Sequence, residues 1–235
     1  MSRFAFLNRV LRRSHALWPA QRILDVGSGD AWFAQQLAAR SYENTQITCW
    51  DSGYGESIAS QVEKSAARME WRRERPRQEF DLLLLLDVLE HIADDGTFLN
   101  ETVRLNAAPG SFVLVTVPCW PYLFSAHDVH LRHMRRYRPA ECRDLLTSSG
   151  LRILKEGGFY HSLLVFRVLA VLAERIGRWQ KPPDDLGQWN VGSFATCFVT
   201  GTLKVDNAFT DLFSRLGLCV PGLSYWALCQ KTRPS

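Results

Sequence analysis

The sequence predicts an α/β fold in which helices cover both faces of a doubly wound, mostly parallel sheet. Two observations lead to this prediction. From residue 22 onward, short apolar runs typical of strands alternate with segments whose apolar residues recur at helical spacing. The run over 80–86, Phe-Asp-Leu-Leu-Leu-Leu-Leu, is apolar almost throughout, which is typical of a strand buried on both faces. In such sheets, ligands bind at the carboxyl ends of the strands.

The expected elements follow one another in a regular order. Pro118 stops one strand, Pro139 and Glu141 begin a helix, and Gly150 ends that helix. The pattern predicts strands at 22–26, 46–51, 69–73, 80–86 and 111–117, and helices at 30–40, 56–67, 95–106 and 139–150. Further helical patterns cover 161–178 and 202–216, and residues 224–230 have the pattern of a closing strand.

The composition is that of an ordinary globular protein. Of 235 residues, 46% are hydrophobic and 22% are charged, which is enough apolar material for a sizeable core. A net charge of +4 is too small to indicate a nucleic-acid partner by itself. The six cysteines show no zinc spacing, and Cys49 and Cys119 lie in or beside expected core strands. Residues 1–21 lack the apolar core of a secretory signal. We therefore expect buried thiols in a reducing, cytoplasmic setting.

The most informative segment is 22–30, Arg-Ile-Leu-Asp-Val-Gly-Ser-Gly-Asp, where an apolar strand leads into a glycine turn flanked by acids. Gly27 and Gly29 carry no Cβ, so a ligand can approach the backbone closely. The helix expected from Asp30 points its N-terminal amides at the same place. Asp51 ends the next strand, where an acid binds ribose hydroxyls in nucleotide-binding units of this kind. The sequence thus predicts a nucleoside site, with an ordinary strand-to-helix turn as the alternative.

The turn differs from the dinucleotide fingerprint G-x-G-x-x-G, because Trp32 stands in place of the third glycine. Without that glycine the helix cannot pack as close to the strand, and a pyrophosphate has a poorer seat. Asp30 at the helix start repels a phosphate but can accept a hydrogen bond from an ammonium group. The site therefore favours an unphosphorylated nucleoside with a cationic tail.

Three stretches in order resemble the class I methyltransferases that use S-adenosylmethionine. They are Ile23–Asp30, then Asp51, and then Phe80–Leu82 with Leu86–Ile92, and the resemblance extends over residues 22 to about 159. It implies that the glycine turn holds the methionine end of the cofactor, that Asp51 binds the ribose, and that Asp87 to His91 borders the sulfonium. The predicted cofactor-binding residues are Asp25, Gly27, Gly29, Asp30, Asp51 and Asp87.

The resemblance also predicts the outer architecture. The fold is Rossmann-like, and in the family the last two strands are antiparallel, so residues 151–157 and 224–230 are expected to form that pair. The chain then divides into an N-terminal amphipathic helix (1–21), a methyltransferase core (22–159 and 223–235), and a helical insertion or lid (160–222).

Residues 122–137 hold the densest group of polar side chains, and they follow the fifth strand of the predicted sheet. A hydroxyl acceptor must lose a proton, and a histidine is the usual base near neutral pH. His127 and His133 are the candidate bases, with Asp128 orienting one of the rings. The alternative is that these residues form a hydrogen-bonded lid. No carboxylate pair stands at ligand spacing from these histidines, so no metal is expected.

Other polar residues near the expected site have two interpretations each. His91 is either a base or the cap of a turn, and Arg135 or Arg136 could hold an acidic group of the substrate. The adenine-contacting acid of the family is not evident in the charge-rich run 70–79. There Trp71 either stacks on adenine or belongs to a solvated face.

Two apolar segments bear on partners. Residues 1–18 read as a basic amphipathic helix, which could touch a membrane surface, cover the cofactor, or pack against its own domain. Residues 161–178 are apolar almost all round, which favours burial in a lid or contact with a greasy acceptor. Their polar interruptions are too frequent for a membrane span.

Together these patterns predict transfer of a methyl group from S-adenosylmethionine to an oxygen, or less readily a nitrogen, of a small or lipid-linked acceptor. The looser match to Leu89–Ile92 and to His127, Asp128, Arg135, Arg136 and Tyr137 is with small-molecule enzymes that include quinone-ring O-methyltransferases. The alternative is a non-catalytic, cofactor-binding adapter that docks on a partner or membrane. Methylation of a nucleic-acid base is disfavoured, since Val117-Pro118-Cys119-Trp120 carries no Asn/Asp-Pro-Pro-Tyr motif.

Overall fold

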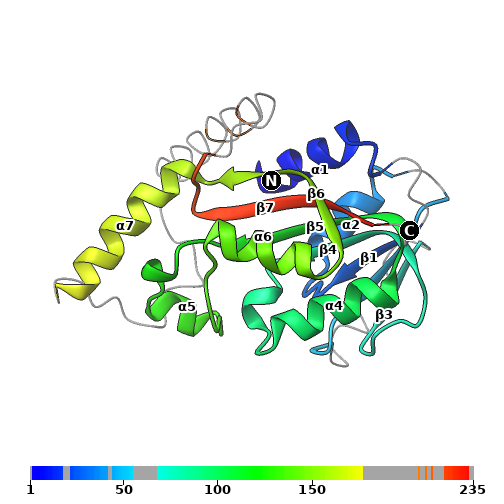
Figure 1. The fold of residues 1–235 in the computed structure, drawn as a ribbon, viewed down its shortest axis with the longest axis horizontal. Coiled ribbons are helices and arrows are strands. Elements are labelled where there is room, and N and C mark those ends of the chain that lie inside the picture. Colours follow the sequence, from blue (N-terminus) through cyan, green and yellow to red (C-terminus); the bar gives the residue numbers. More distant parts are fainter. Residues whose placement is uncertain are drawn as a thin grey trace.

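The computed structural model describes residues 2–17, 22–41, 44–54, 68–176, 206, 210, 213 and 220–232. Within this part of the chain, seven strands form one sheet in the order β3-β2-β1-β4-β5-β7-β6 (Figure 1). The strands are β1 (Arg22–Val26), β2 (Gln46–Trp50), β3 (Met69–Arg72), β4 (Phe80–Leu86), β5 (Ala107–Pro118), β6 (Leu151–Phe159) and β7 (Ser224–Lys231). β1 to β5 pair in parallel, and β7 is antiparallel to both β5 and β6. The predicted mostly parallel sheet with an antiparallel last strand is confirmed.

Helices cover the two faces of this sheet, each over its own apolar core. On one face lie α1 (Ser2–Arg13) and α2 (Trp32–Ala38), and on the other lie α4 (Asp95–Asn106) and α6 (Pro139–Ser148). Alternate residues of each strand feed opposite cores, because side chains of a strand point to alternating faces. In β4, for example, Leu82 and Leu84 belong to the first core, and Leu83 and Leu85 to the second. This explains why the strand is apolar throughout.

Short elements follow β4 and β5 at the carboxyl edge of the sheet. They are the 3₁₀ turns η1 (Leu89–His91) and η2 (Pro121–Leu123), and the one-turn helix α5 (Ala126–His130). Ser125 caps α5, since its hydroxyl accepts from the backbone of His127, and Asp128 accepts from the backbone of Ser125. α7 (His161–Arg175) projects from the same edge (Figure 1).

β5 begins four residues earlier than predicted. The strand runs through Pro109 and Gly110, and Gly110 adopts φ 83° within a shift of register opposite Phe80 and Leu82. A bulge of this kind lets a strand continue through residues that would otherwise end it. The helix at the N-terminus ends at Arg13, earlier than predicted. The other described boundaries coincide with the predicted ones or differ from them by one to three residues.

β6 and the segment before β7 approach so closely that only glycine fits. A Cβ on Gly158 would lie 2.4 Å from the backbone of Val220 and Gly222, and a Cβ on Gly222 would lie 2.4 Å from Phe159 O. We call this contact the glycine clasp. It joins the two ends of the segment that connects β6 to β7.

α1 packs against its own domain. Its apolar side chains Phe4, Phe6, Leu7, Val10 and Leu11 are all buried against the sheet and α2. The burial matches the expectation that the amphipathic face contacts the protein itself. It leaves the apolar face of α1 unavailable to a membrane surface.

Some predictions fall on residues outside the described part. The expected helix at 56–67 lies there entirely, and so does most of the expected helix at 202–216. The division of the chain into helix, core and insertion stays a prediction, as does the lid. Cys49 and Cys119 are buried free thiols, as expected. Within the described ranges, no helix combines the length and apolar character needed to cross a membrane.

Candidate functional site: two carboxylate centres at the carboxyl edge of the sheet

The glycine turn after β1 is held by backbone and carboxylate contacts. Gly27 (φ 61°) and Gly29 (φ 54°) both adopt left-handed conformations that favour glycine. A Cβ on Gly27 would meet Val88 Cγ2 at 2.9 Å, so this glycine is needed for packing against the segment after β4. A Cβ on Gly29 would meet nothing within 4 Å, so Gly29 borders open space. Of the two glycines, Gly29 is therefore the one placed to admit a ligand.

Asp51 links the turn to the end of β2. Its Oδ2 accepts from the backbone N of Gly29 at 2.9 Å, and its Oδ1 accepts from Gly53 N at 2.7 Å. These bonds order both loops that follow the first two strands. They also fix the carboxylate at the carboxyl edge, as the sequence predicted for a ribose-binding acid.

Three carboxylates gather at this turn, those of Asp25, Asp30 and Asp51. None of them forms an ion pair within the described residues. Asp25 is 3% exposed, and its burial together with the charges of Asp30 and Asp51 raises its pKa to about 7. We call this group with Gly27 and Gly29 the glycine-turn site. Its charge suits a cationic ligand with hydroxyl groups and opposes a phosphate.

The expected adenine side of the site is lined by aromatic rings. Trp71 is half-buried and packs edge to face on Tyr54, with ring centroids 5.2 Å apart. The Tyr54 hydroxyl hydrogen-bonds Ser28 of the glycine turn. Much of the run 70–79 is exposed, but Trp71 is not part of a solvated face. Stacking of Trp71 on adenine stays a prediction.

Asp87, directly after β4, is held in a left-handed conformation with φ 58°. Its backbone N donates to Thr116 O at 3.0 Å, and its carboxylate accepts from the hydroxyl of Thr116 at 2.9 Å and from Arg3 of α1. Arg3 also donates to Thr116 Oγ1 and lies over the ring of Phe159. The polar partner that this acid requires is thus an arginine more than eighty positions away, which sequence reasoning missed.

Glu90, three residues further on, is fully buried. Neither of its carboxyl oxygens has a hydrogen-bond partner in the described part of the chain. Burial, reinforced by the charge of Asp87, raises the pKa of Glu90 to about 9, although Arg3 and Arg136 act in the opposite direction. Glu90 is therefore a neutral acid at pH 7. No pattern in the sequence indicated that this member of Leu-Glu-His-Ile would be buried.

Asp128 of α5 is the centre of a second group of charges. Its side chain is fully buried, and each oxygen accepts two hydrogen bonds. Oδ1 accepts from Arg136 Nε at 2.7 Å and from His133 Nδ1 at 3.0 Å. Oδ2 accepts from Ser125 N at 3.0 Å and from Arg167 Nη2 at 2.9 Å. We call Asp128, His133, Arg136 and Arg167 the Asp128 cluster.

These bonds decide the ionisation of Asp128. Burial by itself would raise the pKa of the carboxyl group, but Arg136, His133 and the amide of Ser125 together hold it below its usual range. The carboxylate is thus ionised at neutral pH and accepts a hydrogen bond from Nδ1 of His133. This fixes the tautomer of His133 and leaves Nε2 as its basic nitrogen.

The other predicted polar residues have different surroundings. His127 is half-buried, and burial followed by the charge of Arg167 lowers its pKa. Arg136 also donates to Cys119 O at 3.1 Å, and Arg135 pairs with Asp95. Both arginines predicted to hold an acidic substrate group thus contact the protein itself. The structure links Asp128 to His133 rather than to the ring of His127.

His91 lies beside the cluster. Its ring packs edge to face on that of His133 at 4.8 Å, and its Nδ1 contacts Arg132 O at 3.2 Å. Ligand atoms of Glu90, His91 and His133 lie within 4.8 Å of one another, a grouping of metal-binding residue types that sequence reasoning did not anticipate. Glu90 is protonated and near the guanidinium groups of Arg3 and Arg136, which opposes a dication. The expectation of no metal stays a prediction.

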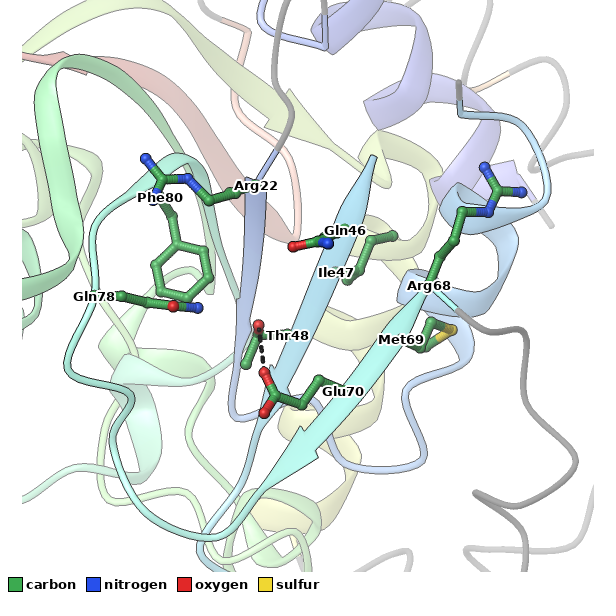
Figure 2. A pocket seen from close by; sticks show the side chains of 9 residues that line it. All are labelled: Arg22, Gln46, Ile47, Thr48, Arg68, Met69, Glu70, Gln78 and Phe80. Atoms are coloured by element: carbon green, nitrogen blue, oxygen red, sulfur yellow. Dashed lines mark hydrogen bonds between the residues drawn. The ribbon is translucent and has the colours of Figure 1, made fainter. Parts of the chain in front are cut away.

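A hollow of about 230 Å³ lies elsewhere, where β1 to β4 begin (Figure 2). In its lining, Thr48 Oγ1 of β2 donates to Glu70 Oε2 of β3 at 3.5 Å. No described helix connects β3 to β4, so this part of the sheet face stays open. It is at the opposite edge from the glycine turn, and ligands of such sheets bind at the carboxyl edge. Its full lining is Arg22, Gln46, Ile47, Thr48, Arg68, Met69, Glu70, Gln78 and Phe80.

A Rossmann-like sheet with an acidic glycine turn at its carboxyl edge defines a nucleoside-binding α/β protein. The model of the methyltransferase domain family matches residues 3–156, and the chain belongs to this family. Membership confirms the predicted family of S-adenosylmethionine-dependent methyltransferases and implies S-adenosylmethionine as the cofactor. The glycine-turn site fits that molecule, since it has unpaired carboxylates for a cationic tail and open space beside Gly29.

The chain is similar to curated proteins named ubiquinone biosynthesis O-methyltransferase. It is 25% identical over 182 residues to that of Rhodopseudomonas palustris strain TIE-1, covering 69% of this chain and 66% of the relative. It is 25% identical over 126 residues to that of Azorhizobium caulinodans, covering 50% and 49% of the two chains. The chain therefore spans less than two thirds of these relatives.

Solved structures share the fold. A crystal structure of a SAM dependent methyltransferase from Archaeoglobus fulgidus superposes with a TM-score of 0.56 at 15% identity. The superposition covers 97% of this chain and 94% of the other. At this identity the likeness establishes the fold alone.

Proposed function

We propose that this protein transfers the methyl group of S-adenosylmethionine to an oxygen of a small or lipid-linked acceptor, and less readily to a nitrogen. The observation that carries the proposal is the Asp128–His133 pair at the same edge of the sheet as the glycine-turn site. One centre suits the cofactor, and the other suits an acceptor that must lose a proton.

The glycine-turn site has the roles of binding and orientation. Asp51 would accept hydrogen bonds from the ribose hydroxyls, since its carboxylate is already fixed by Gly29 and Gly53. Asp25 and Asp30 would stabilise the cationic end of the cofactor, and Gly27 would keep the turn packed on Val88. Asp87 would border the sulfonium from the end of β4. When bound, S-adenosylmethionine supplies an electrophilic methyl group on its sulfonium.

His133 has the role of general base. Nδ1 donates to the ionised Asp128, so Nε2 can take the proton of an acceptor hydroxyl, which leaves an oxygen nucleophile for the methyl group. Asp128 stabilises the imidazolium that forms. His127 is the second candidate, and its lowered pKa favours the neutral, basic ring. No nucleophilic side chain is required, because positioning of the two reactants can supply much of the rate.

The acceptor is proposed from two observations. The relatives named ubiquinone biosynthesis O-methyltransferase are 25% identical, which favours a small molecule methylated on oxygen. α7 exposes Val165, Phe166, Leu169 and Leu172, each between 48% and 60%, near η2 and α5. At about 100° per residue, Val165, Leu169 and Leu172 lie on the side of α7 opposite Arg167, so this apolar surface faces away from α5. It would suit the greasy tail of an acceptor rather than its reacting group.

The test combines calorimetry with a transfer assay. We expect S-adenosylmethionine to bind, and methyl-labelled cofactor to label a phenol or catechol from a panel that also holds amines. Labelling of amines alone would overturn the choice of oxygen. Absence of binding, with NADH or ATP binding instead, would overturn the assignment of the site.

The rival is the non-catalytic adapter that docks through its basic N-terminal helix. Binding of the cofactor with no labelling across the panel, together with liposome binding lost on deleting residues 2–13, would favour it. Against it stands the burial of the apolar face of α1, which would have to leave its own core to dock elsewhere.

A further inference from the structure

Arg167 differs from its neighbours on α7 because the charged side chain is largely buried while the apolar side chains beside it are exposed. Its neighbours Val165 and Phe166 are apolar and exposed by 60% and 58%. The arginine side chain is 15% exposed and points toward α5. An arginine on a helix surface normally keeps its charged end in water. Burying the charge here has a cost in desolvation that only specific partners can offset.

Three described partners of Arg167 lie on the segment that leads to the candidate base. Nη2 donates to Asp128 Oδ2 at 2.9 Å, to Ser125 Oγ at 2.7 Å, and to Leu123 O at 3.4 Å. These residues lie 39 to 44 positions away in the sequence. A single guanidinium therefore ties α7 to η2, to the cap of α5 and to Asp128.

Asp128 transmits this contact to His133. One carboxylate oxygen accepts from Arg167, and the other accepts from Nδ1 of His133. The carboxylate is planar, so a change in the position of Arg167 rotates the oxygen that orients the imidazole. Arg136 donates to the same Asp128 oxygen as His133, Oδ1. Because Arg136 does not lie on α7, its hydrogen bond does not depend on where α7 docks.

We propose that Arg167 is a positioning residue that orients the Asp128–His133 pair, so that the geometry of the candidate base depends on the docking of α7. The inference rests on the proposed function, in which His133 is the base. It assigns to α7 a part in the reaction: the side of the helix that carries Arg167 orients the base, while its exposed apolar residues lie on the other side.

The first test uses the full-length protein and the variant Arg167→Met. We expect kcat to fall by about 10- to 100-fold, as small displacements of a catalytic group do, with KM for S-adenosylmethionine within about twofold. Arg167→Lys should restore part of kcat, because one ammonium can reach Asp128 but does not reproduce the fork of the guanidinium. Arg104→Met, an exposed arginine of α4 near the start of β5, is the matched control and should leave kcat unchanged.

The second test is independent of turnover. In histidine-labelled protein, NMR should detect the Nδ1 proton of His133 in its hydrogen bond to Asp128, and Arg167→Met should shift or broaden that signal. If Arg167→Met does not fold, Arg167→Lys, which keeps the positive charge but not the fork of the guanidinium, replaces it in both measurements. An unchanged His133 signal or an unchanged kcat would overturn the inference about Arg167. Absence of transfer by the wild type would instead overturn the proposed function and leave the NMR comparison standing.

Discussion

The glycine-turn site holds three carboxylates and the Asp128 cluster holds one, both at the carboxyl edge of one sheet, and their surroundings differ in charge. Asp25, Asp30 and Asp51 form no ion pair within the described residues, and Asp25 has a pKa raised to about 7. Asp128 is surrounded by Arg136, Arg167 and His133, and its pKa lies below the usual range. The first centre lacks a cation, and the second contains its own.

The difference indicates what each centre does. Carboxylates held together without a cation destabilise the empty protein and are relieved when a cationic ligand arrives. A carboxylate satisfied by four hydrogen bonds gains nothing from a ligand's charge, but it holds its neighbours in a fixed geometry. The glycine-turn site is thus built to bind, and the Asp128 cluster is built to orient.

The strongest test of this comparison is His133→Ala. If the Asp128 cluster orients a base, the variant should lose about 100- to 1,000-fold in kcat, while its affinity for S-adenosylmethionine stays unchanged. A transfer assay with calorimetry on the same preparation measures both. His130→Ala, an exposed histidine at the end of α5 and three residues before His133, is the control. Equal losses in the two variants would mean that His133 has no special role.

Asp51→Ala tests the other side of the comparison. The change removes the bonds to Gly29 and Gly53 and the expected contact with the ribose, so affinity for S-adenosylmethionine should fall by at least about 100-fold. Calorimetry would measure it against Asp144→Ala, an exposed acid of α6. Wild-type affinity in Asp51→Ala would show that the carboxylate does not face the cofactor.

Asp25 predicts a dependence of binding on pH. Because its pKa is about 7 in the free protein, raising the pH from 6 to 7.5 ionises it and should strengthen binding of the cationic cofactor by about 5- to 10-fold. Asp25→Asn should flatten this dependence. Calorimetry at several pH values provides the comparison, and an equal slope in both proteins would exclude Asp25 as the titrating group.

The smallest expected effect concerns stability near Glu90. An unfolded chain releases the proton of Glu90 above pH 4.5, whereas the folded protein keeps it until about pH 9. The free energy of unfolding of the wild type therefore falls as pH rises through this window, and that of Glu90→Gln does not fall for this reason. Between pH 6 and 8, the Tm of the variant should rise by about 5–11 °C relative to that of the wild type. Parallel Tm curves would contradict a buried neutral acid.

Much of the fold could be predicted because its signals are local. β1 and β4 carry mostly apolar runs, and α4 begins at the Asp94 cap and ends at Asn106 as its period indicated. The start of β5 was missed because a bulge at Gly110 lets a strand pass through residues typical of a loop. The residue types around Gly110 alone could not distinguish a loop from a strand with a bulge.

The candidate site divides in the same way. The glycine turn, Asp51 and the group around Asp128 could be located, since each follows a strand. Arg3 and Arg167 could not be assigned to them, because their contacts join segments 39 to 113 positions apart and depend on helix packing. The burial of Glu90 was likewise set by tertiary neighbours rather than by its own motif.

The glycine clasp has a consequence for how this protein can be altered. Gly158 and Gly222 bring the two roots of a 64-residue stretch (160–223) together at one spot beside the edge strands. Because the ends of this stretch already meet, the closure of the sheet sets no particular length for the chain between them. A change that spares α7 should therefore leave both the sheet and the contact of Arg167 with Asp128 in place.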